Sequence, residues 1–578
     1  MKVKFPLIIE DQLATQSNGM PPVEHLKEHR EDFFLDGPVT KRVAVLDFNS
    51  LTGELVPGVR FQRPADLEGV GRYEIKDERD LNSPDFNQVS VFATVLKTMY
   101  MFEEADTLGR PLTWAFNAPQ LLIVPRAGEW ANAYYERETH SLQFFYFYPE
   151  FEGGVSDKPI YSSLSHDIVC HETGHAILDG IAPDLYNCIS PQALALHEAV
   201  ADLTAFVMAL RSDPLRRTVI RHTGGDLRQR TALSRVAEEF GHGRDPHAEY
   251  LRSLFNQRTL DPQDESKDAF GKPNRVPRDE PHDLSEVLSG ALYNVLVNIF
   301  ESNKEQKRAD GKLRFDTDTA LWASAERFKR MILRSLDYLP PGEVSFADYG
   351  RAIIASDQAS HPNEAQERQW ICDEFIKRHM ALDENALKVA TNFDAPELAA
   401  VNLQTLADSD WAAYEFANNN RKFLGVPEGV NIRVRPRLDT KKKYYRGNKQ
   451  VEYIRELIFK VSWDYKEPNK LGRFFPDERQ ITIGTTLAID WSTKRVRALL
   501  TSDFSEKTSG RGGQGEKERA LQQGDRDTIL TRLADEGILQ LAGRAMGPDS
   551  RPIDSVVRAE ASDNLMRVRG AARMLHII

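Results

Sequence analysis

Cysteine is scarce in this chain of 578 residues, with three copies at Cys170, Cys188 and Cys372. So few cysteines exclude a disulfide framework, because one bridge at most can form. Long apolar runs are also missing: the longest cover about eight residues, such as 203–210, whereas a bilayer span needs roughly 20. An excess of positive charge is absent too. The net charge of −12, from 75 basic and 87 acidic residues, argues against a nucleic-acid partner held by bulk electrostatics.

We expect no export signal at the amino terminus. Lys2 and Lys4 precede a short apolar patch over 5–9, and Glu10 and Asp11 follow at once. A secretory signal needs about 7–15 apolar residues and a small-residue cleavage site. We therefore expect a cytoplasmic protein with no membrane partner, or one that is exported by a non-standard route.

The composition, 41% hydrophobic and 28% charged, is that of a globular protein, and the length predicts three or four domains. Hydrophobic periodicity predicts helices over 89–106, 234–240, 284–301, 318–339, 346–354 and 363–380. Strands are predicted over 42–48, 120–124 and 142–148. Past about residue 390 alternating segments predict strands over 430–438, 451–463, 480–491 and 496–501, followed by a helix near 528–541. We expect the basic run 441–443 at a solvated hairpin end.

The sequence HETGH at 171–175 carries the strongest chemical signal. Residues four apart on a helix lie one turn above each other, so His171 and His175 can bind one ion. Glu172 is offset by about 100°, which places its carboxylate beside the metal site rather than on the metal. The local sequence supports a helix, with Ser165 as a cap and Gly180 near the end. The alternative is a pair of histidines on a solvated helix face.

A second predicted helix supplies acidic partners. Ser190 and Pro191 form a cap and a first-turn proline, and Glu198 and Asp202 follow one turn apart. A carboxylate from Glu198 completes a His2Glu set that leaves one position open for water, as catalytic zinc requires. Asp202 can accept the free ring N–H of a ligating histidine. An exposed acidic stripe is the alternative for this pair.

HETGHAILDGIAPDLY at 171–186, followed by HEAVAD at 197–202, resembles the thermolysin-like zinc metallopeptidases, which are gluzincins. The resemblance covers roughly residues 75–385. It implies an α+β fold: a β-rich N-terminal subdomain, the active-site helices and an α-helical C-terminal subdomain. An extra C-terminal α+β domain is expected beyond it. The expected segments are an N-terminal extension (1–75), the subdomain with both motif helices (76–242), a long polar loop (243–283), the helical subdomain (284–388) and a β-rich accessory domain with a terminal helix (389–578).

The resemblance also assigns roles to single residues. It implies that His171, His175 and Glu198 bind zinc, that Glu172 is the general base and that Asp202 is the partner of His171. Tyr186 falls where the family has a tyrosine that donates to the developing oxyanion, although a core aromatic is the alternative.

Three further assignments rest on the resemblance and have strong alternatives. Asn132 and Ala133, followed by two tyrosines, resemble the family's edge-strand segment that holds the substrate backbone; a surface turn is the alternative. His282 is the candidate for the second oxyanion donor. It lies seven residues before Ser289, farther than the family's spacing, where Glu286 stands instead. A loop histidine without a role is the alternative.

The chain also departs from the family. The 22 residues between His175 and Glu198 are slightly more than the family's usual number, and the acidic cluster of its paired calcium site has no counterpart after Asp202. We expect one zinc ion and no paired calcium site.

These features predict a zinc metalloendopeptidase acting on a peptide or protein substrate. A gluzincin aminopeptidase is one alternative, but we find no Gly-x-Met-Glu-Asn-like anchor for a free amine. A non-proteolytic scaffold that keeps zinc for stability and binds a partner through 390–578 is another. Autoinhibition or narrow specificity is a further hypothesis for that segment.

Overall fold

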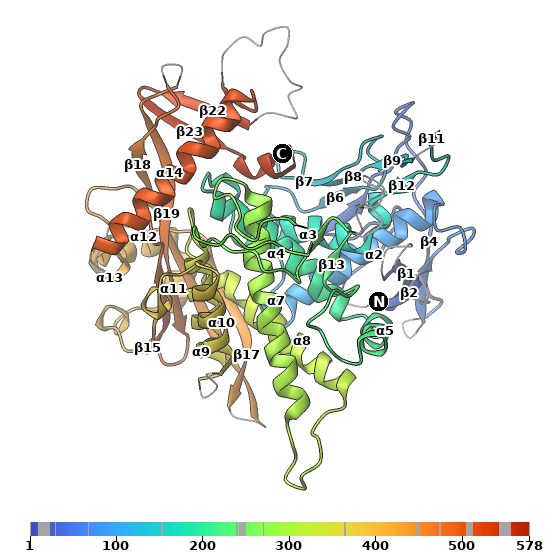
Figure 1. Cartoon of the computed structure of the whole chain (residues 1–578), viewed down its shortest axis with the longest axis horizontal. Coiled ribbons are helices and arrows are strands. Elements are labelled where there is room, and N and C mark those ends of the chain that lie inside the picture. Colours follow the sequence, from blue (N-terminus) through green and yellow to red (C-terminus); the bar gives the residue numbers. More distant parts are fainter. Residues whose placement is uncertain are drawn as a thin grey trace.

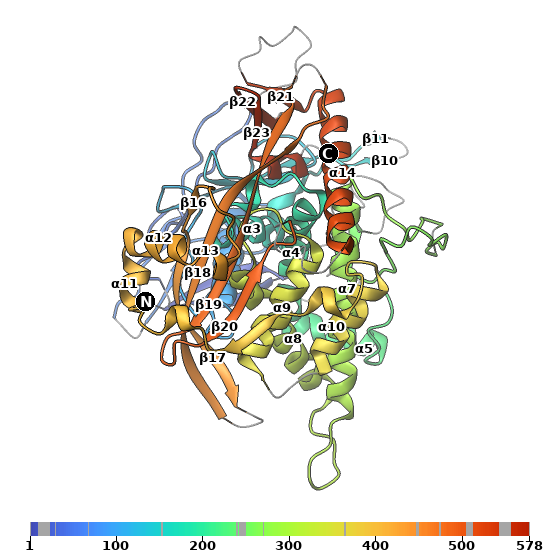
Figure 2. The ribbon, with the colours of Figure 1, turned by 90° about the vertical axis from the view of Figure 1, so that its left-hand side faces the viewer.

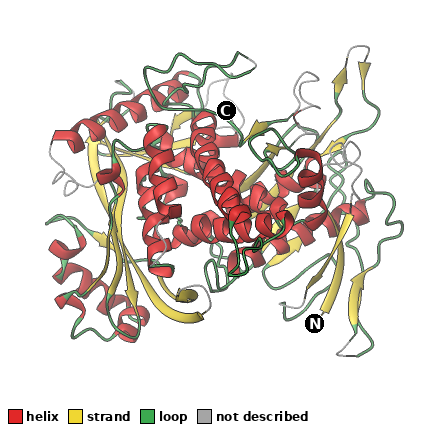
Figure 3. Cartoon of the chain, turned by 60° about the horizontal axis from the view of Figure 1, so that its bottom comes forward, coloured by secondary structure: helices red, strands yellow, loops and turns green. Residues whose placement is uncertain are grey.

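The computed structural model of this chain is a mixed α+β structure in which helices fill the centre and β-sheets lie on both sides (Figure 1, Figure 3). It describes residues 2–9, 23–28, 31–66, 69–151, 154–237, 241, 250–269, 271–362, 366–446, 450–472, 475–504, 513–542 and 557–576. The three cysteines are free thiols.

Two four-stranded sheets build the N-terminal side. The first has the order β2-β1-β5-β4 and the second the order β3-β6-β8-β7, so β7 is an edge strand. Their strands are β1 (Lys2–Ile8), β2 (Val23–Glu28), β3 (Val43–Val45), β4 (Phe61–Gln62), β5 (Val70–Tyr73), β6 (Leu121–Val124), β7 (Ala133–Glu136) and β8 (Ser141–Phe144). Short pairs follow in β9 (Tyr146–Phe147), β10 (Glu150–Phe151), β11 (Gly154–Val155) and β12 (Ile160–Tyr161). Helix α2 (Pro84–Glu103) packs on β1, because its buried face is rich in Val and Phe.

The central helices contain both predicted motif helices. They are α3 (His166–Ile181), α4 (Pro191–Leu210), α5 (Asp213–Thr223), α7 (Pro281–Glu305), α8 (Thr317–Arg334), α9 (Phe346–Ser360) and α10 (Gln366–Lys377). Short 3₁₀ turns occur at η1 (Ser162–Leu164), η2 (Leu185–Asn187), η3 (Ser335–Tyr338) and η4 (Glu384–Leu387). Helix α4 is long and apolar enough to cross a membrane, but its apolar window is completely buried in the protein, as expected of a core helix.

A nine-stranded sheet follows residue 389. It consists of β15 (Ala390–Phe393), β16 (Ile432–Arg433), β17 (Arg437–Arg446), β18 (Gln450–Pro468), β19 (Glu478–Asp490), β20 (Val496–Thr501), β21 (Leu539–Leu541), β22 (Val557–Ser562) and β23 (Leu565–Arg569). The helical segments of this region are η5 (Pro396–Leu398), α11 (Leu403–Asp408), α12 (Asp410–Asn419), α13 (Arg421–Leu424), α14 (Gly513–Asp535) and η8 (Ala571–His576). In Figure 2, α12 and α13 lie on one side of the long strands, and α9 and α10 lie on the other. We call residues 390–576 the C-terminal region.

Some predicted elements differ from the observed ones. Arg235–Val236 is β13, paired with β14 (Arg252–Ser253), instead of part of a helix over 234–240, whose residues 238–240 lie outside the described part of the chain. Helix α14 begins at Gly513 and ends at Asp535, before the predicted end at 541, and in the described residues beyond it (536–542 and 557–576) three strands and η8 follow. The prediction of a solvated hairpin end at 441–443 is wrong for Lys442, which is buried in β17 and pairs with Asp337.

Candidate metal centre

Helix α3 forms from signals close to its ends. The Ser165 hydroxyl accepts a hydrogen bond from the backbone N–H of Ile168, and Asp167 lies in the first turn, where a negative charge stabilises the helix dipole. His171 and His175 follow one turn apart, and both are buried. The helix therefore directs two imidazoles to one place.

Helix α4 brings the third ligand close to α3. Gly174 permits this approach: a Cβ atom there would lie 3.1 Å from the Cα of Ala201, tighter than ordinary packing. Ser190 precedes α4 but makes no side-chain cap. Instead, the Glu343 carboxylate accepts hydrogen bonds from the N–H groups of Ile189 (2.8 Å) and Ser190 (3.1 Å). A distant residue thus takes over the capping of the helix that carries Glu198.

His171, His175 and Glu198 offer ligand atoms that all lie within 4.8 Å of one another. The two histidine Nε2 atoms are 3.0 Å apart. Glu198 Oε1 lies 3.3 Å from the Nε2 of His175, and Oε2 lies 3.7 Å from the Nε2 of His171. Ligands at 2.0–2.1 Å in a tetrahedron are separated by about 3.3 Å, which matches this spacing.

The hydrogen-bond partner of His171 also favours a cation between the candidate ligands. The Nδ1 of His171 lies 2.9 Å from Asp202 Oδ1 and therefore donates its proton to that carboxylate. The Nε2 of a neutral His171 then carries a lone pair that faces the Nε2 of His175. Two imidazole nitrogens and one carboxylate oxygen are a donor set that suits zinc, so the residues present fit the metal expected from the sequence.

Further charged groups surround the candidate ligands. Arg252 on β14 contacts Glu198 Oε2 at 3.3 Å and Asp202 Oδ1 at 2.9 Å. Burial alone would raise the pKa of Glu198, but His282, His175 and Arg252 hold this pKa well below its usual range. Burial alone would also raise the pKa of Asp202, but Arg252 and His171 lower this pKa below its usual value. Both carboxylates are therefore kept ionised, the form that binds a metal or a ring N–H.

Glu172 lies outside the ligand set. Its Oε2 accepts a hydrogen bond of 2.9 Å from the backbone N–H of Tyr135 on the edge strand β7. Burial raises the pKa of Glu172 to about 7, with His175 opposing this shift and Glu198 adding to it. The carboxylate is thus held between the candidate metal ligands and the strand that was predicted to bind substrate.

His282 reaches the same centre from α7. Its Nε2 lies 3.9 Å from Glu198 Oε2, and its Nδ1 lies 3.2 Å from Glu280 Oε1. Burial alone would lower the pKa of His282, whereas Glu198 and Glu280 raise it above its usual value. Glu286, which stands at the family's spacing, instead pairs with Arg258 at 2.9 Å. The structure therefore places His282, rather than Glu286, at the candidate metal centre.

The remaining predicted residues lie nearby with less direct contacts. Asn132 directly precedes β7, and its side chain accepts a hydrogen bond of 2.8 Å from the N–H of Ala133, the first residue of this edge strand. Tyr186 is buried, and its hydroxyl contacts Glu138 (3.4 Å) and the N–H of Arg137 (3.5 Å). Its role as an oxyanion donor stays a prediction, as does the role of Asn132 and Ala133 in substrate binding.

No protein-family model matches the chain, and no curated protein matches it.

Sequence reasoning missed four contributors to this centre. Arg252 and Glu280 stand in the segment that was interpreted as a long polar loop, where a single charged residue has no spacing signal. His197 was given no role, yet its Nδ1 lies 2.6 Å from the Nδ1 of His175. The contact from Tyr135 is made by its backbone N–H, which a pattern of side chains cannot predict.

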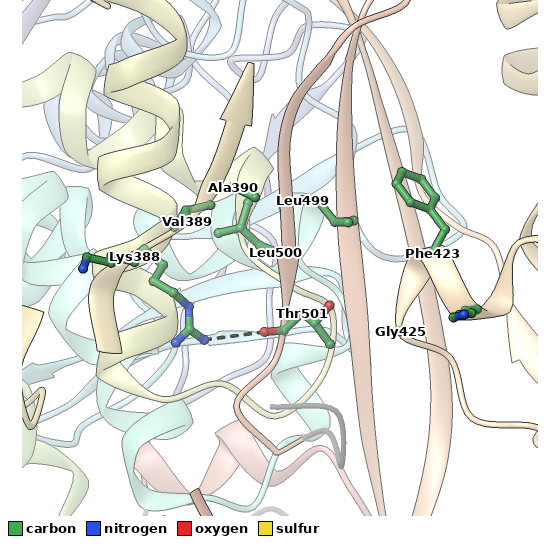
Figure 4. A pocket seen from close by; sticks show the side chains of 10 residues that line it. Lys388, Val389, Ala390, Phe423, Gly425, Leu499, Leu500 and Thr501 are labelled. Atoms are coloured by element: carbon green, nitrogen blue, oxygen red, sulfur yellow. Dashed lines mark hydrogen bonds between the residues drawn. The ribbon is translucent and has the colours of Figure 1, made fainter. Parts of the chain in front are cut away.

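A separate cavity of about 240 Å³ lies among α9, β15 and β20, with Lys388, Phe423, Leu499 and Thr501 among its lining residues (Figure 4). Arg351 donates a hydrogen bond to the Thr501 carbonyl at its wall (3.5 Å). The cavity lining shares no residue with the metal centre, so we assign it no part in the chemistry proposed below.

Proposed function

We propose that this protein is a zinc-dependent endopeptidase with a thermolysin-like catalytic region over about residues 75–385. The observation that carries the proposal is the placement of Glu172: it is buried next to the His171, His175 and Glu198 triad, is absent from that triad, and accepts a hydrogen bond from an edge strand. A zinc site that serves only stability is closed by four protein ligands and has no use for such a carboxylate.

The chemistry follows from the position of each group. Zinc, when bound, supplies a Lewis acid that makes water nucleophilic at neutral pH. Glu172 would take the proton from the attacking water and pass it to the leaving amine. His282 would donate a hydrogen bond to the substrate oxygen as that oxygen gains negative charge, and Tyr186 is the second candidate donor.

The edge strand β7 supports a peptide substrate. An extended peptide can add to the exposed edge of a sheet through main-chain hydrogen bonds. The N–H of Tyr135 points from β7 to Glu172, so a peptide bound along this edge would pass beside the proposed base. We propose a peptide or unfolded protein as substrate and, from the sequence, a cytoplasmic location.

The first test replaces Glu172 by Gln. We expect the variant to keep one zinc per chain, measured by metal analysis, while its rate of casein hydrolysis falls about 10²–10⁴-fold through loss of the general base. The matched control is Glu301→Gln on α7, which breaks the 2.8 Å pair with Lys304 and a 3.9 Å contact with Arg228, both outside the candidate metal centre, and should leave the rate unchanged.

Three outcomes contradict parts of this proposal. Full activity of Glu172→Gln would show that this residue is not the base. Cleavage of free but not acetylated peptides would identify an aminopeptidase. A zinc-loaded wild type that is inert on every peptide would indicate a structural metal.

A further inference from the structure

We propose that helix α14 of the C-terminal region belongs to the proposed catalytic centre, because Arg532 positions the His282 ring through Glu280. This inference rests on the proposed function and adds a positioning residue to it. Arg532 Nη1 lies 3.0 Å from Glu280 Oε2, and Glu280 Oε1 lies 3.2 Å from the His282 Nδ1. The other ring nitrogen lies 3.9 Å from Glu198.

The two carboxylate oxygens of Glu280 have separate tasks. Oε1 accepts hydrogen bonds from both the ring Nδ1 and the backbone N–H of His282 (3.3 Å). Oε2 accepts a hydrogen bond from Nη1 of Arg532. Arg532 also donates through Nη2 to the carbonyl of Asp279 at 3.0 Å. The guanidinium therefore fixes the two residues that precede α7. Glu280 in turn accepts the Nδ1 proton and orients the ring with Nε2 towards Glu198, and Nε2 would donate to the substrate oxygen in the imidazolium form, which carries a proton on both ring nitrogens.

Helix α14 contacts the starts of α4 and α7, two of the three helices that supply the centre. Asp525 pairs with Arg278, three residues before α7, at 3.0 Å. Arg526 donates to the Ser190 hydroxyl at the start of α4 (3.1 Å) and pairs on its other side with Glu467 of β18. The C-terminal region is thus tied to the segments that orient His282 and Glu198.

An ordinary surface ion pair would not have the consequence that we propose. The side chains of Arg532 and Glu280 are 28% and 20% exposed, and a pair of this kind contributes little to stability. The Lys304–Glu301 pair at the other end of α7 has a matching exposure of 28% and 27%. If Arg532 acts only on stability, the two pairs should respond alike to substitution.

The experiment compares Arg532→Gln with Lys304→Gln in the full-length zinc-loaded protein. For Arg532→Gln we expect kcat to fall about 10- to 100-fold with little change in KM. The reason is that the hydrogen bond from His282 to the substrate oxygen is needed only in the transition state. Arg532→Lys, which keeps a cation near Glu280, should recover part of the loss. In a His282→Ala background, Arg532→Gln should cause no further loss, since the two residues act as one unit.

A second measurement needs no activity. In the metal-free protein, reaction of His282 with diethyl pyrocarbonate, followed by peptide mass spectrometry, should be faster in Arg532→Gln than in wild type or Lys304→Gln, because the ring has lost its support. Unchanged kcat and unchanged labelling in Arg532→Gln would overturn the inference while leaving the peptidase proposal intact. A wild type without peptidase activity would instead refute the proposed function, and faster labelling of His282 would then still show that Arg532 positions the ring.

Discussion

The helix pair α3 and α4 and the boundary between the central helices and the C-terminal sheet both contain buried charges, but they assemble them over very different sequence distances. In the helix pair, His171 and Asp202 are 31 residues apart, and the two histidines are four apart. At the sheet boundary, buried Asp337 pairs with Arg110 and Lys442, which lie 227 and 105 residues away. The first arrangement can be recognised from spacing on a helix, whereas the second exists only once the chain has folded.

The largest effect should come from removing a ligand in the helix pair. We expect His175→Ala to bind no stoichiometric zinc, because two ligands remain where catalytic sites use three. At a free zinc concentration 1,000 times the dissociation constant, wild type should gain about 4 kcal/mol of stability, which this variant should lack. Thermal unfolding with and without zinc measures the difference, and equal zinc-dependent shifts in both proteins would contradict a metal site at His175.

A large loss of stability is expected at the sheet boundary. Asp337 is fully buried, lies 2.7 Å from Arg110 and 2.6 Å from Lys442, and has a pKa that Arg110 and Lys442 hold well below its usual range although burial opposes this. Asp337→Asn would leave buried cations without their anion, so we expect a loss of about 3–5 kcal/mol. Urea unfolding measures this loss. A cost below 1 kcal/mol would show that the boundary does not depend on this network.

A smaller effect is expected one contact away from the metal ligands. Asp202→Asn replaces the carboxylate that accepts the His171 ring proton. Replacing a residue that hydrogen-bonds to a metal ligand lowers metal affinity about 10- to 100-fold. Competition with a fluorescent zinc chelator measures the affinity. Unchanged affinity would mean that the contact of Asp202 with His171 does not affect metal binding and that Asp202 only forms the ion pair with Arg252.

The smallest effect should come from an exposed pair in the same sheet as Lys442. Lys466 on β18 lies 3.9 Å from Glu478 on β19, with side chains 62% and 48% exposed. We expect Lys466→Gln to change stability by less than about 1 kcal/mol, because water screens such pairs. A loss as large as that of Asp337→Asn would show that burial does not explain the difference between the two sites.

The success of sequence reasoning follows the same division. His171 and His175 on one predicted helix, and Glu198 and Asp202 on another, each follow the helical repeat, and the structure brings these four residues together. That three of them bind zinc stays a prediction. Most long helices and strands were also predicted, since their apolar periodicity is local. The burial of Lys442 was missed because its partner lies on a distant segment, and the 234–240 helix prediction was wrong where Arg235–Val236 pairs with β14.

The Arg532–Glu280 contact can form only late in the synthesis of the chain, after Arg532 has left the ribosome. Chains grow by about 5–20 residues per second, so on the order of half a minute separates the synthesis of Glu198 from that of Arg532. His171, His175 and Glu198 are therefore synthesised well before Arg532, whose guanidinium contacts Glu280 in the folded protein. If the protein is the peptidase that we propose and Arg532 is required, this delay keeps its activity low while its own unfolded segments, and those of neighbouring chains, are most vulnerable to cleavage.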